Sequence, residues 1–146
     1  MSDTGKTGRT RLRYKIHWHV LFTHFPVAFF MLSSGFMMLH LFTRRHCFEL
    51  AAFLSLLAGG GILIPTAASG WLTWKGHYRG MRGKMFLYKI RVALGMIVLS
   101  FVLIVIRLLY PPPLDPAWVW IYAAGILLLM IGAMIEGFYG GRLNHR

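Results

Sequence analysis

The chain has 146 residues, of which 57% are hydrophobic and only 14% are charged, a balance that is too apolar for a soluble domain of this size. Lys and Arg number 16 against 4 Asp and Glu, which gives a net charge of +12. Because these basic residues flank long apolar stretches, contact with anionic lipid headgroups accounts for the charge better than nucleic-acid binding, which we do not expect.

Four apolar stretches follow one another along the chain, and each is long enough to cross a bilayer as an α-helix of about 20 residues. They lie at about residues 20–42, 50–74, 87–109 and 117–136. The first two contain no charged residue, and the third has an uncharged centre whose flanking Arg91 and Arg107 can extend toward the two membrane surfaces. Basic residues precede the first stretch as in a secretory signal, but its length and the lack of a cleavage pattern predict a retained anchor.

The connections between these stretches predict which helices are neighbours. The first and third connections, at residues 43–49 and 110–116, are short, and short connections place consecutive helices side by side and antiparallel. Glycines in the second and fourth stretches predict close helix packing. The predicted fold is therefore all-α: an integral membrane, up-down four-helix bundle in a single domain that covers residues 1–146.

Basic residues are distributed unequally between the two ends of this bundle. The N-terminal tail, the segment from Lys75 to Arg91 and the C-terminal tail hold five, six and two of them, whereas the opposite end has only Arg44, Arg45 and Arg107. Because short basic segments tend to stay in the cytoplasm, we expect a multi-pass protein with both termini cytoplasmic. The single cysteine, Cys47, excludes a disulfide within the chain.

Most of the histidines lie near the predicted cytoplasmic end. They are His17, His19, His24, His77 and His145. His24 lies about one turn inside the first stretch, where a histidine needs a partner. His17 precedes it by seven residues, so the two lie on one helix face about 10 Å apart and cannot bind the same iron. His24 is therefore either a ligand shared with another helix or a hydrogen-bond donor to a backbone carbonyl, Ser69 or Thr73.

A b-type haem needs one or two imidazoles from facing helices, an apolar pocket and basic groups near its propionates. We expect His24 and His77 as axial ligands of the iron, with Trp71 or Trp74 against the ring. Arg79, Arg82 and Arg91 are candidates near the propionates, and His19 suits an interface or propionate contact. The alternatives to His77 as a ligand are His19 or His17 from a neighbouring subunit, or a group other than histidine. His40 lies about 24 Å along the helix from His24, which predicts an interfacial histidine and not a second haem.

The acidic residues are few, and the sequence lacks a nucleophile elbow, a phosphate-binding loop and a Cys-x-x-Cys pair. Glu136, at the inner end of the fourth stretch, is predicted to pair with Arg91 or to carry protons near a quinone headgroup. These features favour an electron-transfer or accessory subunit over a stand-alone enzyme.

One motif carries a family resemblance. The segment His19–Ala28 resembles the His-Pro-x-x-Val-His-Phe-Pro-Ile-Ala signature of a family of small four-helix membrane proteins that is known mainly as a domain of unknown function. The two signature histidines fall on His19 and His24. Gly70–Trp74 is similar to the family's Gly-x-x-Asp-Trp, and Gly140–Leu143 to its terminal Gly-Gly-x-Leu.

The chain departs from the family pattern at three places. Val20 replaces the proline of the signature, Thr73 replaces the aspartate, and no histidine stands at residues 84–88, where the family has one. What the resemblance implies is a protein of the bacterial inner membrane that bears haem and accompanies respiratory proteins. It implies no particular activity.

Two functions from different classes remain as expectations. The first is a small cytochrome b-like membrane subunit that binds one haem and mediates electron transfer in a larger complex, with quinone as a candidate electron partner. The alternative is a cofactor-free accessory or structural subunit of a respiratory or photosynthetic membrane complex. Both need the lipid bilayer and other membrane protein subunits as partners.

Overall fold

The computed structural model describes the backbone of residues 6–77, 84–112 and 116–143, and the side chains of residues 24–72, 87–112 and 117–138. These residues form four α-helices: α1 (Lys6–Thr43), α2 (His46–His77), α3 (Lys84–Leu109) and α4 (Pro116–Leu143). No strand occurs in these ranges. The predicted all-α fold is confirmed.

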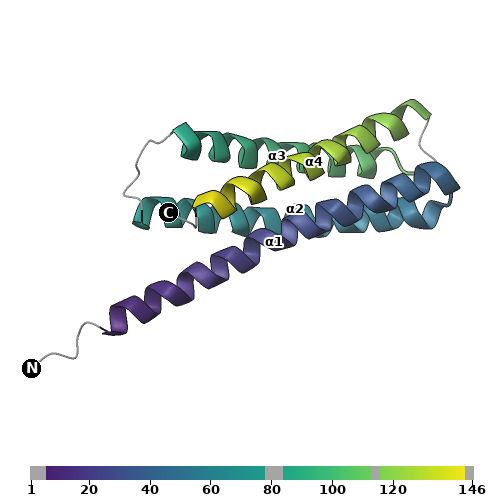
Figure 1. Ribbon diagram of the computed structural model, residues 1–146. Helices are drawn as coiled ribbons and strands as arrows, with labels where there is room; N and C mark the ends of the chain where they lie inside the picture. The colour runs from purple at the N-terminus through teal and green to yellow at the C-terminus, as the bar shows by residue number, and fades with distance from the viewer. Residues whose placement is uncertain (1–5, 78–83, 113–115, 144–146) are drawn as a thin grey trace, which may run out of the picture.

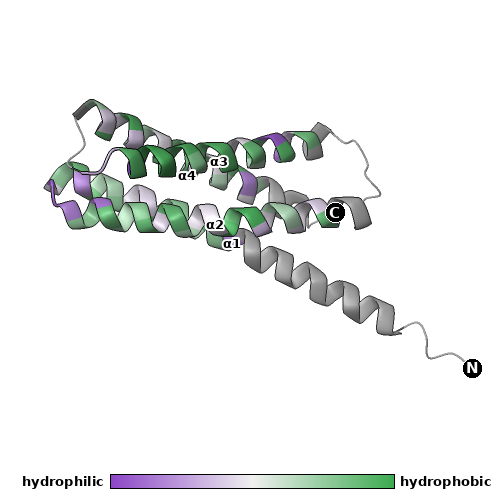
Figure 2. Cartoon of the chain, turned by 180° about the vertical axis from the view of Figure 1, so that it is seen from behind, coloured by the Kyte–Doolittle hydropathy of each residue, from purple (hydrophilic) through white to green (hydrophobic). Residues whose placement is uncertain are grey.

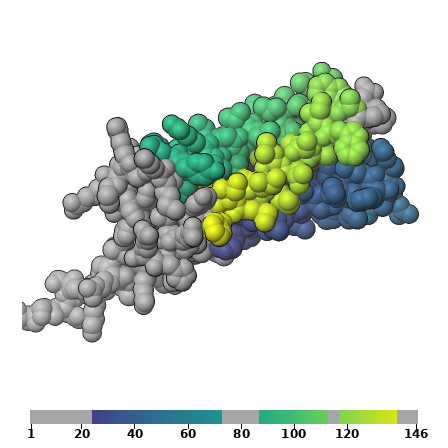
Figure 3. Space-filling model, turned by 45° about the horizontal axis from the view of Figure 1, so that its top comes forward, coloured from purple at the N-terminus to yellow at the C-terminus, as the bar shows by residue number. Residues whose placement is uncertain are grey.

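The helices run antiparallel to their sequence neighbours and form a four-helix bundle (Figure 1). α1 and α3 each pack against both α2 and α4, so every helix has two main neighbours. Figure 3 shows one face of this arrangement, with α4 lying along α3. α1 is the longest helix, with 38 residues, and its N-terminal part extends past the other three helices (Figure 1).

Each helix contains a segment that is long and apolar enough to cross a membrane. These segments are His24–Thr43, His46–Leu72, Leu87–Leu109 and Ala117–Phe138. Apolar side chains also cover the outside of the bundle: Leu94 of α3, for example, is 60% exposed. Figure 2 shows that hydrophobic residues occur along the coloured parts of all four helices. In water such faces would carry polar residues. The chain is therefore a multi-pass membrane protein whose outer faces suit lipid.

The interior of the bundle is closely packed around side chains from every helix. Its most buried members include Phe30, Leu56, Leu103, Ile126 and Leu129. A Cβ atom added at Gly59 of α2 would lie 2.9 Å from the Phe30 ring of α1, and one added at Gly125 of α4 would lie 2.6 Å from Leu103 of α3. The close helix packing that the sequence predicted from its glycines is therefore present at these two positions.

The two ends of the bundle differ in their connections. At one end, here called the loop end, Arg44 and Arg45 alone join α1 to α2, and residues 110–115 join α3 to α4. Arg44 adopts a left-handed conformation with φ of 55°, and its N–H donates to the His40 carbonyl (2.8 Å), which closes α1. The His40 ring donates to the Arg45 carbonyl through Nδ1 (3.0 Å). The other end, where α1 begins and α4 ends, is called the terminal end.

This link is shorter than the predicted connection of residues 43–49. α2 begins at His46, so Glu49 lies in the helix and not in a loop. The physical reason is that Glu49 has a buried cationic partner on α3, described below, and a neutralised carboxylate can enter the bundle.

Candidate functional site

The predicted haem residues that the structure describes lie on the outside of the bundle. On α1, Phe30 and Met37 face the core, whereas His24 is exposed. Arg91 on α3 is exposed as well. His17 and His19 belong to α1, and Trp74 and His77 to α2, but their side chains lie outside the described set. Arg79, Arg82 and His145 lie outside the described residues altogether.

The register of α1 against α2 places His24 and His77 at different depths. Ser33 Oγ of α1 donates to the Ala52 carbonyl of α2 (2.8 Å), and Phe30 lies against Gly59. Continuing this antiparallel register puts His24 level with residues 61–65 of α2. His77 lies at least 12 residues further along that helix, which corresponds to roughly 18 Å of rise. The two predicted axial ligands are therefore not brought together within one chain, and the ligand pair stays a prediction.

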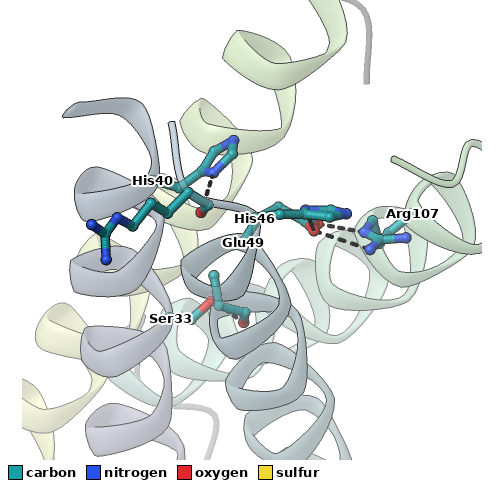
Figure 4. Close-up of polar contacts among 7 residues, drawn as sticks. Ser33, His40, His46, Glu49 and Arg107 are labelled. Atoms are coloured by element: carbon teal, nitrogen blue, oxygen red, sulfur yellow. Dashed lines mark hydrogen bonds and ion pairs between the residues drawn. The ribbon is translucent and has the colours of Figure 1, made fainter. Parts of the chain in front are cut away.

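A cluster of charged residues lies inside the loop end of the bundle (Figure 4). Arg107, near the C-terminal end of α3, donates to both carboxylate oxygens of Glu49 in the first turn of α2: Nε to Oε1, and Nη2 to Oε2 (3.0 Å). The Glu49 side chain is only 2% exposed and that of Arg107 only 10%. The paired hydrogen bonds fix the planar guanidinium against the carboxylate and tie α2 to α3.

A third residue connects this pair to the surface. His46, the first residue of α2, places Nδ1 3.3 Å from Oε2 of Glu49, while its side chain is 63% exposed. Figure 4 shows the imidazole of His46 and the guanidinium of Arg107 approaching the same carboxylate. His46, Glu49 and Arg107 are named the Glu49 cluster. His46 is therefore the exposed member of the cluster, and Glu49 and Arg107 lie buried behind it.

Two aromatic residues complete the surroundings of the Glu49 cluster. The ring of Phe53, one turn along α2, lies 5.1 Å from the guanidinium carbon of Arg107, which places a cation over an aromatic face. Tyr122 of α4 lies within electrostatic range of both Glu49 and Arg107. Its buried hydroxyl has no hydrogen-bond partner among the described residues. Helices α2, α3 and α4 therefore all contribute to this polar region.

A second ion pair lies at the terminal end. Lys89 Nζ of α3 lies 3.7 Å from Oε2 of Glu136 on α4, and both side chains are about one-quarter exposed. The sequence predicted an ion pair for Glu136 but named Arg91 as the partner. The partner is Lys89, because position 89 continues the inward-facing row of α3 that includes Met96 and Leu103, whereas Arg91 faces outward.

Sequence reasoning missed the Glu49 cluster. Arg107 was expected to reach toward the membrane surface, but it is buried against Glu49. A signal was available: Glu49 and Arg107 carry opposite charges at the same end of the second and third apolar stretches, each within one turn of the end of its stretch. Ionisable residues at such depth usually face the bundle interior and pair with one another.

Among the residues with described side chains, no three His, Cys, Asp or Glu side chains come close enough to hold a metal ion. No protein-family model, curated protein or solved structure matches the chain. The resemblance of His19–Ala28 to a family signature therefore stays a prediction.

Proposed function

We propose that this protein is an accessory subunit that packs beside other subunits in a bacterial inner-membrane complex and carries no redox cofactor of its own. The observation that carries the proposal is a set of glycines on the outer faces of the bundle. They are Gly35 on α1, Gly61 on α2, Gly95 on α3 and Gly137 on α4. A Cβ atom added at any of these positions would meet nothing within 4 Å, so no described side chain packs closely against them.

Outward-facing glycines favour association with further helices. In lipid, helices gain little from apolar burial and associate where small residues let their backbones approach closely. Gly35 lies on the same face of α1 as Ala28, seven residues away, and both are exposed. This face is a natural place for a helix of another subunit to pack.

The charged residues inside the bundle also fit a supporting role. Arg107 binds Glu49 between α3 and α2, and Lys89 lies beside Oε2 of Glu136 between α3 and α4, so both pairs hold neighbouring helices together. A catalytic or carrier site would instead need converging polar groups that are left for a substrate.

Copurification in mild detergent tests the accessory proposal. Wild-type protein should migrate in a complex larger than itself on native gels, and crosslinking should join it to other membrane proteins. Gly35→Leu should reduce the recovered partner several-fold, because a large side chain holds the neighbouring helix away. Ile121→Leu, an exposed change on α4 that lies sixteen residues from Gly137, is the control and should leave the complex intact. A wild-type preparation that is a fully functional monomer without bound protein would contradict the proposal.

The exposed position of His24 keeps a second candidate function open. A cytochrome b-like subunit could use His24 as one axial ligand of a haem shared with a neighbouring subunit, because its side chain faces outward from the bundle. Such a haem would pass electrons within the complex, with quinone as the partner that the sequence suggested.

An absorption spectrum of the purified complex separates the two functions. The haem proposal expects reduced-minus-oxidised bands that disappear in His24→Ala and persist in His40→Ala, since His40 lies at the opposite end of its span. Wild-type complex without haem, after growth with adequate iron, favours the accessory function. Equal haem content in wild type and His24→Ala would remove His24 as a ligand.

A further inference from the structure

The Glu49 cluster contains one residue with an exposed side chain and two residues whose side chains are buried. His46 is mostly exposed at the loop end, whereas Glu49 and Arg107 are buried behind it. Histidine is the side chain whose charge ordinarily changes between pH 5 and 8. Its Nδ1 already lies 3.3 Å from a carboxylate oxygen that Arg107 also uses.

We propose that the Glu49 cluster is a proton-sensitive latch between α2 and α3, in which protonation of His46 favours release of Arg107 from Glu49. In the closed arrangement seen here, a protonated His46 would be attracted by Glu49 and repelled by Arg107, so the two effects oppose each other. Once Arg107 has turned toward the nearby membrane surface, only the attraction remains. Protonation therefore stabilises the open arrangement more than the closed one, and lowering the pH shifts the population toward it.

Other charged or titratable groups face this end from each neighbouring element. His40 of α1 is bound to the Arg45 carbonyl, Arg44 and Arg45 form the exposed link, and Cys47 lies beside His46 on α2. These groups do not contact the Glu49 carboxylate, because the structure gives Glu49 contacts to Arg107 and His46.

Tyr122 is the group of α4 within electrostatic range of the Glu49 cluster. Its buried hydroxyl has no hydrogen-bond partner among the described residues. Arg107 lies two residues before the end of α3, so its long side chain can reach the headgroup region when it leaves Glu49.

A spin-label distance measurement tests the latch. Labels at Leu50 of α2 and Leu108 of α3, both exposed at the loop end, report the separation of the two helices without disturbing the core. The protein is used as the full chain in lipid nanodiscs, with Cys47→Ser to remove the native thiol. Between pH 8 and pH 5.5 the ratio of long to short distances should rise about two- to fivefold, the range expected for one charge interaction whose histidine is mostly exposed.

Matched histidine variants decide which residue senses the proton. His46→Gln should abolish the pH response, and His40→Gln should retain it, because His40 contacts backbone and not Glu49. A double variant, Glu49→Gln with Arg107→Gln, should give one distance distribution at both pH values. The proposal is overturned by a distance distribution in the otherwise native chain that does not change with pH, or by a response that survives in His46→Gln.

Discussion

Arg107 and Glu49 join α3 to α2 through two parallel hydrogen bonds at a depth where both side chains are almost fully buried. Both residues lie within one turn of the ends of their apolar spans, and the surrounding protein shields both side chains from solvent. Burying two charges costs free energy that their mutual attraction only partly offsets. The pair therefore specifies how α2 and α3 meet more than it adds to overall stability.

Removing one partner of this pair should lower the free energy of unfolding more than removing both partners. Arg107→Met leaves a buried carboxylate without its cation, and we expect a loss of about 3–5 kcal/mol in the free energy of unfolding. The double variant Arg107→Met with Glu49→Gln leaves no buried charge and should recover much of that loss. Unfolding in mixed micelles by added SDS, followed by circular dichroism, measures both. Equal losses in the single and double variants would contradict this account of the pair.

Gly59 should be far less tolerant of substitution than Gly61, two residues along the same helix. In Gly59→Ala the added methyl group would lie 2.9 Å from the Phe30 ring and 3.1 Å from Phe29 Cβ, so α1 must move away from α2. We expect a loss of about 1–3 kcal/mol from this overpacking.

Gly61→Ala is the control, because its methyl group would meet nothing within 4 Å. It should leave stability unchanged or raise it by up to about 1 kcal/mol through better helix propensity. The same SDS titration compares the two. Similar effects at both positions would show that helix propensity, and not the contact with Phe30, governs this stretch.

The fold could be predicted because the bilayer restricts the choice. Every backbone polar group in lipid must be bonded within the protein, so four long apolar stretches can only be helices, and short connections make them antiparallel. The boundaries of α2 were harder to predict. A glutamate one turn after the link resembles a loop residue until its partner on α3 is known, and that partner lies 58 residues away.

The candidate site was harder to predict than the fold, because its contacts also join residues that are far apart in the sequence. Histidines attract attention as ligands, but their pairing depends on helix register, which hydrophobic pattern alone does not fix. Contacts such as Ser33 with Ala52 set that register in the structure. The Lys89–Glu136 pair shows how far the sequence could go. The sequence predicted a basic partner on α3 for Glu136, but the rotation of α3 about its own axis decides that Lys89, and not Arg91, faces Glu136.

Tyr122→Phe should preserve or increase the stability of the closed bundle. The ring fills the core at 1% exposure, while its hydroxyl has no hydrogen-bond partner among the described residues. Removing a buried hydroxyl that is not hydrogen-bonded should raise the free energy of unfolding by up to about 1–3 kcal/mol. Tyr122→Ala, which also removes the ring, should be strongly destabilising. A clear loss of stability in Tyr122→Phe would reveal a hydrogen-bond partner such as a buried water molecule.

Cys47 offers a direct test of orientation because it is exposed at the loop end, beside the two-residue link. The excess of basic residues toward the other end predicts that the loop end faces the periplasm, with both termini in the cytoplasm. The burial of Arg107 strengthens the charge argument, because it leaves only Arg44 and Arg45 as exposed basic residues at the loop end within the described part of the chain.

A membrane-impermeant thiol reagent applied to intact cells should therefore label Cys47 from the periplasmic side. The Cys47→Ser variant is the control for background labelling, and permeabilised cells give the total signal. Because Cys47 is the only cysteine in the sequence, any specific signal reports this position alone. Labelling that occurs only after permeabilisation would place the loop end in the cytoplasm, and His46 would then respond to cytoplasmic and not periplasmic pH.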